Sequence, residues 1–168
     1  MRFLFVAAVV ALAVSAAKPN GADGIVSAAQ SVCGNYPYSL GGGNDYGATY
    51  GVQQEDPPYC DDRNVVGFDC SGLSKYAVFQ GTGISMLHNA QDQYDNCQNR
   101  VGIDSVSPGD LVFYGDGSSS SSIYHVAVYI GDNQMIEATH HDDNCVGQPS
   151  RQADMRTGDL VDTACRMW

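Results

Sequence analysis

Basic residues are scarce in this chain of 168 residues, which has 8 Lys and Arg against 19 Asp and Glu and a formal net charge of −11. Proteins that bind nucleic acid need clustered cations to neutralise phosphates, so this shortage excludes nucleic acid as a partner. The acidic balance also disfavours tight adsorption to an anionic polymer. It favours a small substrate fragment that is neutral or cationic.

Long apolar runs are equally few. One run covers residues 3–14, follows Arg2 and closes on the small residues 15–17. A charged start, a short apolar centre and a small-residue end are typical of a secretory signal peptide, and the run is too short for a membrane span. We therefore predict a signal peptide over residues 1–17 and a single domain over residues 18–168. The expected product is a secreted, extracellular monomer with no membrane association after cleavage.

The six cysteines bear on both structure and chemistry. They are Cys33, Cys60, Cys70, Cys97, Cys145 and Cys165. In an oxidising compartment, six cysteines suggest three disulfides, and a structural reading would place Cys70 in one of them. If Cys70 is instead a nucleophile, it must stay free, and the other five make at most two bridges with one left over. The sequence leaves the connectivity open.

Cys70 and His125 are the candidate reactive pair. Cys70 opens a helical pattern, and the first turn of a helix favours negative charge, so we expect the pKa of its thiol to be lowered. His125 lies in an otherwise apolar strand pattern over residues 123–130, where a lone histidine needs a partner. A thiolate beside an imidazolium is able to attack an amide carbonyl.

The hydrophobic pattern predicts an α+β domain, with N-terminal helices packed on a mainly antiparallel sheet. The expected helices cover residues 22–33, 71–80 and 88–96, and the expected strands cover residues 110–114, 123–130, 134–139 and part of 158–168. Residues 41–51 and 53–64, rich in Gly, Asn, Pro and acids, are expected to form a surface loop along one wall of a cleft. Residues 117–122 are expected to form a hairpin tip.

The register of the strand after His125 decides which residue orients its ring. If residues 131–133 form a three-residue loop, Glu137 is a diagonal neighbour of His125 on the same face of the sheet. A two-residue turn would put Glu137 on the opposite face. His140 and His141 are the alternatives for this role, although both lie beyond the expected strand.

Four motifs in order resemble the successive motifs of one known family. They are residues 38–42 (YSLGG), 68–73 (FDCSGL), 107–113 (SPGDLVF) and 124–131 (YHVAVYIG). Together they resemble the NlpC-like, papain-like cysteine peptidases of cell-wall turnover. The resemblance implies the papain-like NlpC fold, in which a helix bearing the cysteine packs on an antiparallel sheet bearing the histidine.

The resemblance also implies roles for individual residues. Cys70 matches the nucleophile and His125 the general base. Glu137 occupies the position of the histidine-orienting residue, which in the family is most often a histidine. A carboxylate still suits this position, because it accepts the second ring N–H of His125 and stabilises the imidazolium.

Three further residues are candidates for the oxyanion and substrate-lining part of the site. Tyr38 matches the family tyrosine beside the nucleophile, and the backbone N–H of Cys70 is the expected main oxyanion donor. Asp69 and Ser71 flank the nucleophile, and in some relatives such residues bind the free amino group of a peptide stem. The alternative for Asp69 is a plain helix N-cap.

The substrate implied by the resemblance is the peptidoglycan stem peptide, cleaved between γ-D-glutamate and diaminopimelate or lysine, without a cofactor or metal. The run 140–143 with Cys145 contains zinc-ligand types, but adjacent ligands rarely converge on one ion, and Cys145 suits a disulfide better. Two alternatives stay open. One is a catalytically silent secreted module or effector that binds wall fragments, and the other is an amidase, transglutaminase-like or acyltransferase reaction in the same site.

Overall fold

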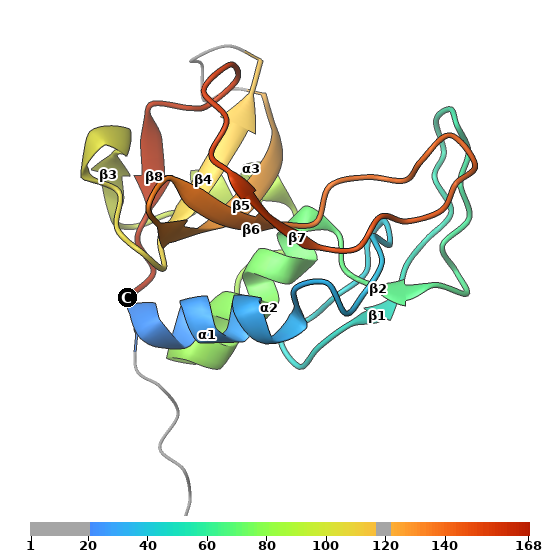
Figure 1. Cartoon of the computed structure of the whole chain (residues 1–168), viewed down its shortest axis with the longest axis horizontal. Helices are drawn as coiled ribbons and strands as arrows, with labels where there is room; N and C mark the ends of the chain where they lie inside the picture. The colour runs from blue at the N-terminus through green and yellow to red at the C-terminus, as the bar shows by residue number, and fades with distance from the viewer. Residues whose placement is uncertain (1–20, 117–121) are drawn as a thin grey trace, which may run out of the picture.

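A six-stranded antiparallel sheet packed against helices forms the centre of the structure (Figure 1). The computed structural model describes residues 21–116 and 122–168, so the predicted signal peptide and most of the predicted hairpin tip lie outside the described residues. The strands follow the order β3-β8-β4-β5-β6-β7. Their bounds are β3 (Arg100–Gly102), β4 (Leu111–Gly115), β5 (Ile123–Gly131), β6 (Gln134–Glu137), β7 (Arg151–Asp154) and β8 (Thr163–Cys165).

The helices precede most of the sheet in the chain, as the sequence predicts. They are α1 (Ala22–Val32), α2 (Cys70–Thr82) and α3 (Ala90–Asp95), with a short 3-10 helix η1 (Ile103–Ser105). A separate two-stranded ribbon consists of β1 (Thr49–Tyr50) and β2 (Val66–Gly67). The predicted α+β class is confirmed, whereas the short strands β1, β2, β3 and β7 were not predicted. None of the described helices is long and apolar enough to span a membrane.

Helix α2 carries Cys70 at its first residue and is fixed at both ends. The Asp69 carboxylate accepts the backbone N–H of Gly72 at 2.7 Å, which satisfies a donor that the first turn leaves free. Gly83 ends the helix in the left-handed conformation, with φ of +80°. At Gly81 a Cβ would meet the backbone N of Ile25 at 2.4 Å, so this glycine permits the close approach of α1 and α2.

The hairpin joining β5 to β6 contains a two-residue turn, not the three-residue loop that the sequence suggested. Asp132 and Asn133 occupy the turn, with φ of 51° and 58°, which is the left-handed pair of a type I′ turn. Gly131 pairs with Gln134 across it. By itself, this turn would place Glu137 on the wrong face of the sheet.

A β-bulge at Ile130 corrects the register. Tyr129 pairs with Met135, while Gly131 pairs with Gln134, so Ile130 is an extra residue on β5. Continued along the strands, this register puts Glu137 on the same face of the sheet as His125. Glu137 therefore shares a face with His125, as expected for a three-residue loop, although the turn itself has two residues.

The sheet buries both of its faces. On one face, Leu111, Phe113, Val126, Val128 and Ile136 pack against the helices. On the other, Val112, Tyr114, Ala127, Met135 and Ala164 form a smaller cluster covered by connecting segments. Since side chains alternate along a strand, His125 and Glu137 belong to this second face.

Two segments far apart in the sequence lie side by side next to the sheet (Figure 1). They are residues 40–67, which include β1 and β2, and residues 139–150, and together we call them the loop lobe. A disulfide between Cys60 and Cys145 joins them, and a second disulfide joins Cys97 to Cys165. Cys33 and Cys70 are free, so the expectation of two bridges with one leftover cysteine besides Cys70 is confirmed.

Candidate active site

Cys70 and His125 line one cavity between the sheet and the loop lobe. Its volume is about 300 Å³, and its wall is formed by Tyr38, Cys70, Tyr124, His125, Thr139, His140, Arg151 and Arg156. Cys70 is partly exposed there and free of any disulfide. A second cavity of about 430 Å³ adjoins it through Tyr38 and His140 and is lined by part of the predicted wall loop, residues 54–58.

The pKa of the Cys70 thiol is raised, which contradicts the sequence-based expectation of a lowered value. Burial of the sulfur and the negative charge of Asp69 raise this pKa to about 12. Hydrogen bonds from the backbone of Val126, Ser71 and Cys70 itself lower it, but by less. The helix start does favour a thiolate, yet desolvation and a neighbouring carboxylate outweigh that effect. The resting cysteine is therefore a protonated thiol that needs a base.

His125 lines the same cavity as Cys70 and is held by Glu137. Its Nε2 is 2.9 Å from Glu137 Oε2, and its side chain is 9 % exposed while that of Glu137 is fully buried. Because Glu137 occupies Nε2, the ring nitrogen available to the cavity is Nδ1. The backbone of Val126, next to His125, contacts the Cys70 sulfur. The fold thus brings the two residues together from α2 and β5.

Glu137 is a shared acceptor for three basic side chains. Besides His125, Arg151 donates to Oε1 through Nε and Nη2 at 3.1 and 3.0 Å, and Arg156 donates through Nη1 to both oxygens at 2.9 and 2.8 Å. Burial raises the pKa of Glu137, but these hydrogen bonds and charges outweigh it and hold the pKa at about 2. Glu137 is therefore ionised and fixed in position at neutral pH.

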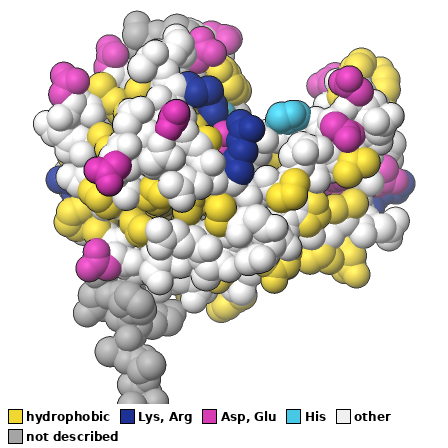
Figure 2. All heavy atoms as spheres, in the orientation of Figure 1, with side chains coloured by type: hydrophobic (Ala, Val, Ile, Leu, Met, Phe, Trp, Pro, Cys, Tyr) yellow, Lys and Arg dark blue, Asp and Glu magenta, His cyan; other side chains and the backbone are white. Residues whose placement is uncertain are grey.

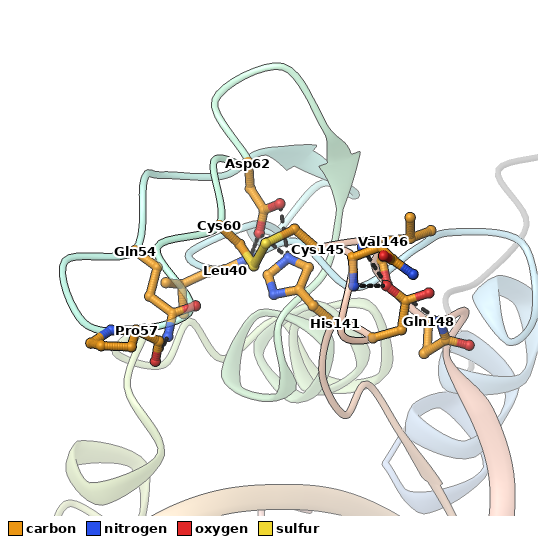
Figure 3. The surroundings of a disulfide bond; sticks show 11 residues. Leu40, Gln54, Pro57, Cys60, Asp62, His141, Cys145, Val146 and Gln148 are labelled. Atoms are coloured by element: carbon orange, nitrogen blue, oxygen red, sulfur yellow. Dashed lines mark hydrogen bonds and ion pairs between the residues drawn. A yellow bond between two sulfur atoms is a disulfide. The ribbon is translucent and has the colours of Figure 1, made fainter.

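His140 and His141, the alternatives to Glu137 for orienting His125, lie elsewhere. His140 lines the cavity but has no contact with His125 that would orient its ring. His141 is buried in the loop lobe, where its Nε2 lies 2.9 and 2.7 Å from the two carboxylate oxygens of Asp62 (Figure 3). Of the three candidates, Glu137 is the one that contacts the His125 ring.

Tyr38 lines both cavities and is anchored by the loop lobe. Its ring packs edge-on against the His141 ring, with centroids 5.0 Å apart. Asp62, which holds His141, also accepts the backbone N–H of Leu40 at 2.6 Å, close to the Cys60–Cys145 disulfide (Figure 3). Burial, followed by the charges of Cys70, Asp69 and Asp62, raises the pKa of Tyr38. Its hydroxyl therefore remains a hydrogen-bond donor at neutral pH.

Asp69 and Ser71 do not line the cavity that contains Cys70. Asp69 Oδ1 accepts from Gly72 N–H, Ser71 Oγ and His88 Nε2, and its Oδ2 accepts from Gly41 N–H. Burial raises the pKa of Asp69, but its hydrogen bonds and the His88 charge outweigh that and lower it. Asp69 therefore caps α2 and joins it to the loop lobe, as in the N-cap alternative, and Ser71 donates to the capping carboxylate.

Asp62, Arg151 and Arg156 were not predicted as site residues. Asp62 stands in a loop full of acids, and nothing local distinguishes it. The two arginines had a usable signal, because six basic residues lie in the described part of so acidic a chain, and Arg151 and Arg156 are two of them within one short stretch after the last histidine pair. Their convergence on Glu137 depends on the pairing of β6 with β7, which joins Glu137 to Arg151 in register.

Comparison with known proteins gives a consistent result. The model of the NlpC/P60 family matches residues 34–152. RipB, a peptidoglycan endopeptidase of Mycobacterium tuberculosis, is 40 % identical over 119 residues, which cover 71 % of this chain and 44 % of that protein. RipA, a peptidoglycan endopeptidase of Mycolicibacterium smegmatis, is 37 % identical over 119 residues, which cover 71 % of this chain and 21 % of that protein. The chain thus spans less than half of these relatives.

Solved structures agree with these matches. A RipA structure mutated at a glutamate has a TM-score of 0.71 with 33 % identity, covering 87 % of this chain and 61 % of that chain. Other RipA structures are mutated at a cysteine and at a histidine. RipD of M. tuberculosis, described as a non-catalytic NlpC/p60 domain protein adapted to peptidoglycan binding, has a TM-score of 0.69 with 28 % identity, covering 88 % of this chain and 97 % of that chain.

Proposed function

The chain belongs to the NlpC/P60 family, and on that premise we propose that it is a secreted cysteine peptidase that hydrolyses peptidoglycan stem peptides. The proposed bond is the one between γ-D-glutamate and diaminopimelate or lysine. The observation that carries the proposal is the cavity shared by a free Cys70 and by His125, whose ring is held by the ionised Glu137.

The relatives support this assignment of residues. The residues mutated in the RipA structures are a cysteine, a histidine and a glutamate in that order along the chain. The mutated histidine and glutamate are separated by 12 positions, as are His125 and Glu137. RipA and RipB are named as peptidoglycan endopeptidases, which supports the same substrate class for this chain.

The proposed reaction begins with proton transfer, because the resting Cys70 is a thiol. His125 Nδ1 takes this proton as the sulfur attacks the amide carbonyl, and the backbone N–H of Cys70 donates to the oxyanion. The C–N bond then breaks, and the leaving amine takes the proton from His125. A water molecule, deprotonated by His125, attacks the thioester, which releases the carboxylic acid and restores the thiol. Glu137 stabilises the imidazolium in both steps.

The test is digestion of purified muropeptides by the secreted protein and by Cys70→Ala, with the products identified by mass spectrometry. We expect the wild type to release stem-peptide fragments and Cys70→Ala to release none, while both unfold at the same temperature. Iodoacetamide should label Cys70 and stop the wild-type reaction. Release of fragments by Cys70→Ala would refute the mechanism, and acyl transfer to an added amine in place of hydrolysis would assign a different reaction to the same site.

RipD gives a reason to test binding separately. Its description as a non-catalytic, peptidoglycan-binding protein means that this fold also serves without catalysis. If the wild type binds muropeptides with intact Cys70 and His125 but releases no fragment, the binding alternative replaces the peptidase. If it cleaves them, Cys70→Ala should retain affinity for the uncleaved peptide, because that substitution leaves the cavity wall in place.

A further inference from the structure

Two arginines form a cationic wall in the cavity of Cys70. Arg151 and Arg156 both line this cavity, and their side chains are 55 % and 45 % exposed. Figure 2 shows a notch between the sheet and the loop lobe, with Lys or Arg side chains gathered on its sheet-side wall. Their position in an otherwise acidic molecule gives the cavity a charge opposite to that of the protein as a whole.

The arginines have more hydrogen-bonding capacity than Glu137 uses. Each guanidinium has five N–H donors, and Glu137 takes Nε and Nη2 of Arg151 and Nη1 of Arg156. Within the described residues, Glu137 is the one carboxylate that forms an ion pair with either arginine. Two positive charges therefore face one negative charge, and Arg151 Nη1 and Arg156 Nε and Nη2 have no acceptor among these contacts.

The remaining described basic side chains are engaged elsewhere. Arg63 pairs with Asp61, Lys75 with Asp45, Arg100 with the Tyr94 carbonyl and Arg166 with Asp110. The excess positive charge of the structure's described part is thus concentrated where a substrate would meet Cys70. Partly exposed guanidinium groups with unused donors are well suited to bind a carboxylate through two parallel hydrogen bonds.

We propose that Arg151 and Arg156 bind the free α-carboxylate of the γ-linked glutamyl residue of the substrate, a proposal that rests on the proposed function. In a γ-linkage the scissile carbonyl belongs to the glutamyl side chain, so the α-carboxylate stays free. Covalent geometry places it roughly 5 Å from the scissile carbon, within the cavity that contains both Cys70 and the arginines. Glu137 and the substrate carboxylate together then balance the two guanidinium charges.

This arrangement makes the arginines specificity-determining for the carboxylate form of the substrate. Replacing the α-carboxylate by an α-amide, as in isoglutamine, removes the charge and one of the two acceptors. Hydrogen bonds between charged groups are worth enough that we expect kcat/KM to fall on the order of tenfold or more for the amide. The carboxylate is recognised by its charge, so the preference should weaken at high ionic strength.

The experiment compares three synthetic peptides: L-Ala-γ-D-Glu-diaminopimelate, its glutamyl α-amide, and the same acid amidated on diaminopimelate instead. We expect kcat/KM to fall for the glutamyl α-amide and to change little for the amidated diaminopimelate. Arg156→Gln should bring the ratio between acid and glutamyl amide close to one, whereas Arg156→Lys retains part of it. The exposed Arg63→Gln, which loses the same charge in the loop lobe, should leave the ratio unchanged.

This ratio separates binding of the substrate from support of Glu137. An arginine that acts through Glu137 alone would slow both peptides equally and leave the ratio as it is. Equal cleavage of acid and glutamyl amide by the wild type would overturn the inference while keeping the proposed function, and a loss confined to the diaminopimelate amide would assign the arginines to that carboxylate instead. If no peptide is cleaved, the proposed function fails, and calorimetric affinity of Cys70→Ala for the three peptides still decides the inference in the same way.

Discussion

Cys70 is the residue at which local and tertiary effects compete most directly. A helix N-terminus favours the thiolate, but burial and the Asp69 carboxylate raise the pKa of the thiol to about 12. In the proposed mechanism, the nucleophile is therefore made during the reaction by proton transfer to His125. It is not stored as a thiolate in the free protein.

A thiol titration tests whether burial and Asp69 outweigh the helix start at Cys70. In His125→Ala, which lacks the base, we expect the rate of iodoacetamide labelling at Cys70 to stay low at neutral pH and to rise only toward the pKa of about 12. The measurement is the pH dependence of labelling, followed by mass spectrometry, with unfolded protein as the reference for an ordinary thiol. Rapid labelling of His125→Ala near pH 7 would show that the helix start outweighs burial.

Glu137 makes the free energy of unfolding fall at low pH. Its pKa of about 2 in the folded protein lies below the ordinary glutamate value of 4.5, so the unfolded chain binds more protons between these values. The stabilisation is complete above about pH 4.5 and is lost as the pH falls toward 2. We expect this group to contribute a slope of up to about 1.4 kcal/mol per pH unit to the free energy of unfolding.

The matched variant is Glu137→Gln, which keeps the size of the side chain but does not titrate. Urea unfolding between pH 2 and pH 5, the window set by the two pKa values, should give a flatter dependence than in the wild type. The exposed Asp104→Asn, in η1, serves as the control for the loss of one acidic group. Identical slopes for wild type and Glu137→Gln would mean that Glu137 titrates normally.

At the scale of the elements, the start of α2 joins Cys70 to the loop lobe. Asp69 caps the helix and accepts the Gly41 N–H at 2.8 Å, so one side chain fixes both segments. We expect Asp69→Ala to lower the free energy of unfolding by about 1–2 kcal/mol. Asp69→Asn, which keeps an acceptor for the cap, should lose less. Equal losses in urea unfolding would show that the charge, and not the cap, supplies the stabilisation.

The β5–β6 hairpin shows how one residue decides the geometry of the site. The type I′ turn at Asp132–Asn133 alone would turn Glu137 away from His125, and the bulge at Ile130 turns it back. Because side chains alternate between the two faces of a sheet, the sequence leaves two possible faces for Glu137 relative to His125. The choice between them depends on whether β5 contains the extra residue at Ile130.

At the scale of the whole molecule, one wall of the cleft belongs to the six-stranded sheet, and the other is the loop lobe, which a disulfide holds together. The sheet side carries His125 and Glu137, while the loop lobe depends on the Cys60–Cys145 disulfide and on the pair of His141 with Asp62. The disulfide links two cysteines that are 85 positions apart. Such a link stabilises the fold chiefly by limiting the conformations open to the unfolded chain. Tyr38 packs against His141 of this lobe, so the disulfide also supports a wall of the cavity that contains Cys70.

Removing the two disulfides separately tests this division. We expect Cys60→Ala with Cys145→Ala to raise KM for muropeptides several-fold, because the wall that positions Tyr38 is loosened. Cys97→Ala with Cys165→Ala, which unlinks β8 from the segment that follows α3, should lower the unfolding temperature. Its KM, measured well below that temperature, should change little. Activity assays and thermal unfolding of both variants decide it, and an unchanged KM in the first variant would show that hydrogen bonds alone hold the loop lobe.

Features that depend on neighbouring residues could be predicted from the amino-acid sequence: the α+β class, the helix that opens at Cys70, the strand that carries His125, and the limit of two disulfides if Cys70 stays free. These follow from local periodicity, capping and counting. The tertiary structure alone decided the pairing of Cys60 with Cys145, the bulge that turns Glu137 toward His125, the convergence of Arg151 and Arg156, and the raised pKa of Cys70. Each of these depends on groups brought together from distant parts of the chain, and burial and charge act through space and not along the sequence.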